Sequence, residues 1–182
     1  MGSLEEIDDR LRAFIAAQQM FFVATAPLDA GGHVNLSPKG LDTLRVLAPR
    51  RIAYLDYVGS GAETIAHVRE NGRIVVMLCA FQGPPKIVRF HGRATVLEPG
   101  HSGYDELCPL FPPVPAGRSI IDIEVDRVSD SCGFGVPLYE FQGHRSQLPA
   151  WCDRKGTDGL RTYQVERNAT SIDGLTAVDW VR

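Results

Sequence analysis

Residues 59–64 of the 182-residue chain contain groups that could bind an anion. The glycines of this stretch, with the hydroxyls of Ser60 and Thr64, come directly before an apolar segment with helical periodicity. Free backbone amides at the start of a helix, with hydroxyls beside them, can hold a phosphate. A structural interpretation is also available: Ser60 and Glu63 have the spacing of a capping box, in which each side chain satisfies the other residue's amide. Both interpretations can hold together, although the carboxylate of Glu63 is a poor neighbour for phosphate.

A second candidate is Lys39, which follows Ser37 and Pro38 at the end of a predicted strand. The strand and the proline together fix the direction of this lysine. A positioned ammonium group is a good point charge for a phosphate. The alternative is an ordinary solvated lysine on the surface.

A third candidate is the basic stretch over residues 86–93. Side chains two apart on a strand share a face, so Arg89, His91 and Arg93 are predicted to point one way, while Lys86 starts on the other. A basic strand face in an acidic protein suggests an anionic ligand. The alternative is that these cations pair with some of the 22 acidic residues.

Composition narrows the classes of function. The net charge of -3 argues against a sequence-independent nucleic-acid binder. The acidic first residues do not resemble a secretory signal, and no apolar run reaches the roughly 20 residues of a membrane span, so we expect a cytoplasmic protein without membrane contact. The four cysteines are scattered, which indicates reduced thiols rather than a disulfide framework or a metal site. We find no GxSxG, Walker or GxGxxG motif, and no catalytic residue can be named from spacing.

The elements that would position these candidates are predicted mainly as strands. Strands are expected over residues 20–26, 33–37, 51–57, 73–79, 86–97 and 119–128, and helices over 7–15, 62–71, 104–110 and 148–168. Pro38 is expected to end its strand, Gly72 to end a helix and Gly92 to mark a bulge. The short connections favour antiparallel pairing. The pattern therefore predicts a mainly β (α+β) barrel of about six strands with peripheral helices.

Four sequence blocks together resemble the pyridoxamine 5'-phosphate oxidase-like, FMN-binding split-barrel family. The order and spacing of all four agree with the branch of that family whose members are uncharacterised, over about residues 10–130. The blocks are Asn35–Gly40, Tyr54–Asp56 leading into Gly59–His67, Glu70–Arg73 and Phe81–Lys86. The loop from Cys132 to Pro137 and the ending Ser171–Leu175 also resemble that branch. The resemblance implies one split-barrel domain over residues 1–182, with the core at about 10–130 and a loop and helical tail over 131–182.

The family implies a homodimer with FMN in a groove between the subunits, and a small-molecule substrate. Residues 34–39 would lie along the flavin, with Lys39 near phosphate or substrate. Tyr57 and Val58 would flank the ring system. Ala62, Glu63 and Thr64 would lie where the oxidases place a basic pair that binds the phosphate. Lys86 and Arg89 would stand beside Ile87, which takes the place of a ring-contacting glutamine.

Two departures from the family pattern limit which of the family's properties can be expected of this chain. Glu63 and Thr64 replace a basic pair that binds phosphate, so Lys39, Ser37, Ser60 and the helix amides would have to hold it. The tail also lacks the substrate-binding arginine and histidine segment of the oxidases, so vitamin B6 oxidation is not implied. The sequence therefore predicts an FMN-dependent oxidoreductase acting on a small organic substrate. Two alternatives stay open: a split barrel that uses deazaflavin or haem, and a non-catalytic flavin-binding or dimeric interaction protein.

Overall fold

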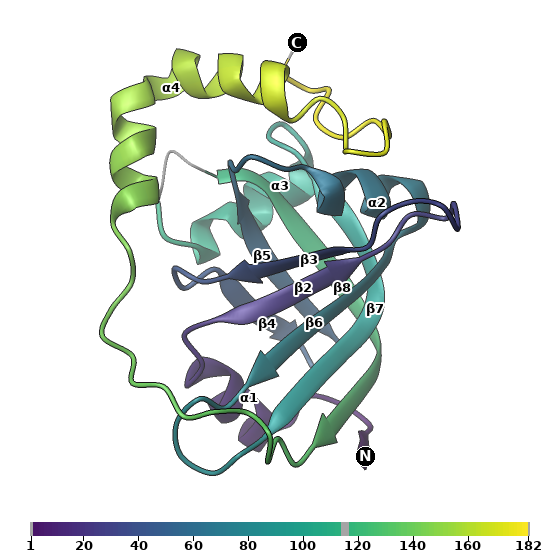
Figure 1. The fold of residues 1–182 in the computed structure, drawn as a ribbon, viewed down its shortest axis with the longest axis vertical. Helices are drawn as coiled ribbons and strands as arrows, with labels where there is room; N and C mark the ends of the chain where they lie inside the picture. The colour runs from purple at the N-terminus through teal and green to yellow at the C-terminus, as the bar shows by residue number, and fades with distance from the viewer. Residues whose placement is uncertain (1, 114–116, 182) are drawn as a thin grey trace.

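The protein is built on one antiparallel sheet of eight strands that curves into a split barrel (Figure 1). A computed structural model describes residues 2–113 and 117–181. The strands run in the order β3-β2-β6-β7-β8-β5-β4, and β1 pairs with β8. Their bounds are β1 Gly2–Leu4, β2 Phe21–Thr25, β3 Asn35–Lys39, β4 Leu44–Ala48, β5 Arg51–Tyr57, β6 Arg73–Cys79, β7 Ile87–Leu97 and β8 Gly117–Ser131. The predicted fold class is confirmed.

Helices cover the two ends of the barrel (Figure 1). Helix α1 (Asp9–Ala16) lies at one end, and α2 (Glu63–Asn71) and α3 (Ser102–Leu107) lie at the other. A 3-10 turn, η1 (Cys108–Leu110), follows α3, and the tail forms α4 (Gln147–Arg167), which is interrupted by a non-helical residue at Gly156. Between β8 and α4, residues 132–146 form a long irregular segment, here called the strap, which runs along the outside of the barrel (green in Figure 1). No helix of the described residues is both long and apolar enough to cross a membrane.

Alternation of buried and exposed residues fixes which face of each strand turns inward. In β2, Phe21, Val23 and Thr25 are buried, and in β7 the buried set includes Val88 and Phe90. The four apolar side chains among them meet the apolar side of α1 in one core cluster, which also contains Ile7, Leu11, Ile15, Tyr54, Ile65, Val76, Leu78, Ile121 and Ile123. The inward face is thus set by ordinary hydrophobic burial.

The predicted bulge at Gly92 is confirmed. The register between β7 and β8 shifts between His91 and Gly92. A Cβ atom at Gly92 would lie 2.1 Å from the carbonyl oxygen of Glu124, so only glycine lets the two backbones approach this closely. Gly72 ends α2 as predicted.

Two predictions about local structure are wrong. Pro38 does not end its strand, because β3 runs from Asn35 to Lys39 with Pro38 paired to Phe22. Strand β3 is at the edge of the sheet, where a residue without an N–H group can be accommodated. Ser60 and Glu63 also do not form a capping box, since the N-cap of α2 is Ala62 and no side chain caps the helix. The six predicted strands are present, and the structure adds β1 and β4.

Candidate functional site

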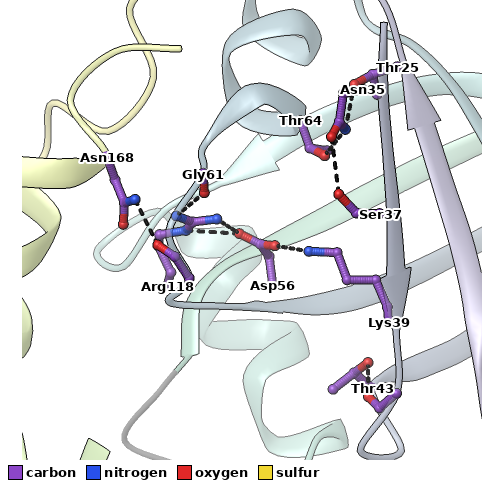
Figure 2. A network of polar contacts seen from close by, with 12 residues as sticks. Thr25, Asn35, Ser37, Lys39, Thr43, Asp56, Gly61, Thr64, Arg118 and Asn168 are labelled. Atoms are coloured by element: carbon purple, nitrogen blue, oxygen red, sulfur yellow. Dashed lines mark hydrogen bonds and ion pairs between the residues drawn. The ribbon is translucent and has the colours of Figure 1, made fainter. Parts of the chain in front are cut away.

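The inward face of β3 presents three polar side chains toward β5 and α2 (Figure 2). The alternation of β3 leaves Leu36 and Pro38 exposed, and turns Asn35, Ser37 and Lys39 to the other side. The strand therefore places two predicted site residues, Ser37 and Lys39, on one face. Two separate polar networks begin from them.

The first network is an ion cluster centred on Asp56 of β5. The Lys39 ammonium lies 3.0 Å from Asp56 Oδ1, and Arg118 of β8 donates to Asp56 Oδ2 from Nε at 2.9 Å and from Nη2 at 2.7 Å. The third nitrogen of Arg118, Nη1, donates to the carbonyl of Gly61 at 2.9 Å (Figure 2). The Asp56 side chain is fully buried, Arg118 is 3% exposed and Lys39 is 22% exposed. We call Lys39, Asp56 and Arg118 the charge triad.

The charge triad carries one net positive charge. Burial by itself would raise the pKa of Asp56, but the attraction of Arg118 and Lys39 outweighs burial and holds the pKa of this carboxyl below its ordinary value. Asp56 is therefore ionised at neutral pH and balances one of the two cations. Because Arg118 is buried and Lys39 is partly exposed, Lys39 is the member of the charge triad through which the excess charge can reach solvent or a ligand. This arrangement differs from the solvated surface lysine that the sequence left as an alternative.

The second network links β3 to α2 and β2 by neutral hydrogen bonds. The Ser37 hydroxyl donates to Asn35 Oδ1 at 3.0 Å, and Asn35 Nδ2 donates to the hydroxyls of Thr64 at 2.9 Å and Thr25 at 3.1 Å (Figure 2). Thr25 Oγ1 lies 3.0 Å from Nδ1 of the buried His67. Burial lowers the pKa of His67, which favours a neutral imidazole in this contact.

The start of α2 is occupied by the protein's own groups rather than left open for an anion. Glu63 Oε1 accepts from the backbone amide of Ile172 at 3.3 Å. Its other oxygen lies so close to Gly61 that a Cβ atom there would be 2.3 Å away. Ser60 is exposed and lies two residues before the N-cap. The carboxylate of Glu63 thus places negative charge where the sequence suggested a phosphate.

The tail closes this side of the barrel. Asn168 Nδ2 donates to the carbonyl of Gly59 at 2.9 Å, and Asp173 binds His33 of the β2–β3 connection through both its carboxylate oxygens, at 2.7 and 2.8 Å. Val58 is buried against Cys152 and Leu160 of α4. Tyr57 is half-buried beside the same cluster, and burial raises the pKa of its hydroxyl.

Lys86 and Arg89 lie away from the charge triad. Arg89 of β7 is paired across the sheet with Met77 of β6, which is paired with Phe22 of β2, which is paired with Pro38 of β3. Paired residues share a face, so Arg89 is on the same face as the exposed Pro38, opposite to the face of Lys39. Arg89 donates to the hydroxyl of Ser131 at 3.2 Å. Lys86 pairs with Asp130 at 3.7 Å and covers the ring of Phe14. The structure thus brings together Ser37, Lys39 and Thr64, and separates Lys86 and Arg89 from them.

Sequence reasoning missed Asp56 and Arg118 as site residues. Asp56 did carry a signal, because an acidic residue within a strongly apolar strand requires a partner. Arg118 carried none, since it lies 62 residues from Asp56 along the chain. Only the pairing of β5 with β8, which places Asp56 opposite Ser119, brings the two together.

The comparisons with known proteins agree with this architecture. The family model described as pyridoxamine 5'-phosphate oxidase matches residues 7–132. The pyridoxamine 5'-phosphate oxidase family protein ustO of Aspergillus flavus is 38% identical over 189 residues, covering 94% of this chain and 75% of ustO.

Solved structures show the same fold at lower sequence identity. HupZ of Group A Streptococcus aligns with a TM-score of 0.53 and 20% identity over 69% of this chain and 94% of HupZ. A candidate pyridoxamine 5'-phosphate oxidase of Lactobacillus delbrueckii aligns with a TM-score of 0.52 and 16% identity, over 71% of this chain and 99% of that one.

Proposed function

Because the chain belongs to the pyridoxamine 5'-phosphate oxidase family, we propose that it binds a flavin, FMN, and acts as a flavin-dependent oxidoreductase on a small organic substrate. The observation that carries the proposal is the charge triad. It holds one cation, Lys39, at a fixed place on the inward face of β3, and leaves one positive charge uncompensated. Flavin electronics respond to charge placed near the ring system.

The residues present fit the neutral parts of a flavin better than its phosphate. The Ser37 hydroxyl, the Asn35 amide and the Lys39 ammonium can donate to or accept from a polar ring edge and a polyol chain. The phosphate would meet Glu63 at the start of α2, where the carboxylate repels it. Lys39 is therefore the residue best placed to attract the anionic end of FMN. The bound flavin would supply the electron-transfer chemistry, while the protein positions it and tunes its charge.

We further propose that the flavin lies between two copies of the chain. Lys39 and Arg89 are on opposite faces of the sheet, so one ligand cannot reach both within a single chain. A second copy that presents its Arg89 face toward the Lys39 of the first would bring both cations to one ligand. The exposed apolar side chains on and beside β3, Val34 at 75% and Leu36 at 65%, would be covered in such a pair.

The proposal is tested by adding FMN to the purified protein and following its visible absorption, with the molecular mass measured by sedimentation with and without FMN. A saturable complex with one FMN per chain in a dimer is the expected result. Reduction of the bound flavin by an added electron donor would then support the oxidoreductase. Bound flavin that no donor reduces would favour a non-catalytic flavin carrier, and no uptake would refute flavin binding.

A further inference from the structure

A cavity of about 710 Å³ opens beside the charge triad, and its walls come from segments far apart in the sequence. The α1–β2 connection, the end of β3, the β6–β7 connection, the strap and the start of α4 all contribute. This volume is within the range of small-molecule sites, roughly 300–1,000 Å³. Lys39 is the only residue of the charge triad that lines it. A molecule in the cavity would therefore be next to the cation that we assign to the flavin.

The cavity wall is largely apolar and contains three aromatic rings. Phe81 of the β6–β7 connection stacks at a tilt against Tyr139 of the strap, with ring centroids 5.4 Å apart. The ring of Phe141 contacts His144 at 5.0 Å. Tyr139 is 62% exposed and Phe141 is 44% exposed, although both line the cavity. A ligand with an apolar ring would cover these rings, and this burial would favour binding.

The charged groups of the cavity wall favour the binding of a ligand with a carboxylate group. Lys39, Arg145 and His144 line the cavity, and Glu140 is the one acidic side chain there among the described residues. None of the ion pairs of the described residues includes Arg145. The charge on Lys39 is also not cancelled, because Arg118 already balances Asp56. A guanidinium without a partner binds a carboxylate through two parallel hydrogen bonds.

The strap is attached to the barrel near one side of the cavity. The amide of Tyr139 donates to the carbonyl of Phe81 at 2.9 Å. This bond sets the position of Tyr139, and the following residues 140–145 run exposed to the start of α4. Arg145 is thus placed on a segment that is fixed at both ends, by Phe81 and by α4.

From these observations we infer that the cavity binds a small organic acid with an aromatic body, its carboxylate on Arg145 and its ring against Phe81 and Phe141. That this acid is the substrate of the flavin rests on the proposed function. Its binding does not, because the cavity is formed by the chain as it stands.

The probes for a test are naphthalene-2-carboxylate and its neutral counterpart 2-naphthamide, titrated calorimetrically into the full chain with and without FMN. We expect the acid to bind about tenfold more tightly than the amide, as one charge-assisted hydrogen bond would give. Arg145→Gln should remove this preference and leave the amide unchanged. Arg154→Gln, at an exposed arginine of α4, is the matched control and should change neither affinity. Phe141→Ala should weaken both probes.

The outcomes separate this inference from the proposed function. Absence of binding by both probes, equal affinities for acid and amide, or an Arg145→Gln variant that keeps the preference would each overturn the inference. Acid binding in a protein that takes up no FMN would support the cavity and refute the flavin. FMN uptake without acid binding would support flavin binding and overturn the inference about the cavity.

Discussion

Two pairs of basic residues, Lys39 with Arg118 and Lys86 with Arg89, have opposite surroundings in the folded chain. Lys39 and Arg118 enclose a fully buried carboxylate, whereas Lys86 and Arg89 lie away from it, beside Asp130 and Ser131. Burial makes the first pair costly to disturb, because an unpartnered Asp56 could not be solvated. The second pair is half exposed, and water screens its contacts. The comparison shows that the sign of a charge says little until its partner and its burial are known.

The largest expected effect follows from removing the buried half of the first pair. Arg118→Met leaves Asp56 with Lys39 alone and deletes the bond to the Gly61 carbonyl. We expect the free energy of unfolding to fall by about 3–5 kcal/mol, the usual cost of breaking a buried ion pair. Urea unfolding of the FMN-free protein measures it. A loss under 1 kcal/mol would show that the charge triad does not stabilise the fold.

The pH dependence of stability is the next effect. The pKa of Asp56 is lowered in the folded chain from its ordinary value of 3.8. The stability that the ionised Asp56 carboxylate adds to the fold is therefore fully present above pH 3.8, and it is lost as the pH falls through the pKa of Asp56 in the folded chain. We expect the difference in unfolding free energy between wild type and Asp56→Asn to be largest above pH 3.8 and to shrink below it. A difference that does not vary with pH would contradict the assignment.

Reversing the charge at the start of α2 should have a smaller effect. Glu63→Lys replaces the carboxylate that faces the expected phosphate with an ammonium group. We expect the ratio of the variant's affinity for FMN to its affinity for riboflavin to rise about three- to fivefold, as for a partly exposed charge pair. Fluorescence titration of both flavins measures the ratio. Glu166→Lys, at an exposed position of α4, is the control that should leave the ratio unchanged.

The smallest effect is expected for the second pair, Lys86 and Arg89. Lys86→Gln removes a partly exposed ion pair with Asp130 at 3.7 Å. We expect the unfolding free energy to change by about 0–1 kcal/mol, which urea unfolding in parallel with Arg118→Met would show. A loss as large as that of Arg118→Met would erase the distinction between the two pairs.

Local patterns in the sequence were sufficient for most elements of the fold. The helical spacing of Leu11 and Ile15, the stop at Gly72 and the bulge at Gly92 each depend on neighbouring residues, and each is confirmed. Strand β4 was missed because its sequence, Leu-Arg-Val-Leu-Ala, is short and does not keep a strict alternation of apolar and polar residues.

The site was less predictable, because it depends on contacts between distant segments. Ser37, Lys39 and Thr64 were predicted and lie near one another, but Arg118, the second partner of Asp56, is brought there only by the register of β5 with β8. The position of Pro38 within its strand depends on β3 being an edge, which is a property of the whole sheet. The place of Glu63 depends on the tail reaching back to it, 109 residues along the chain.

The most direct test of the central claim is the FMN dissociation constant of three proteins measured side by side: wild type, Lys39→Met and Lys86→Met. If the charge triad presents Lys39 to the flavin, Lys39→Met weakens FMN by about tenfold or more, and Lys86→Met by much less. Circular dichroism establishes that all three are folded. Equal affinities in wild type and Lys39→Met would contradict the account, because the charge that Asp56 and Arg118 hold in place would then have no part in binding.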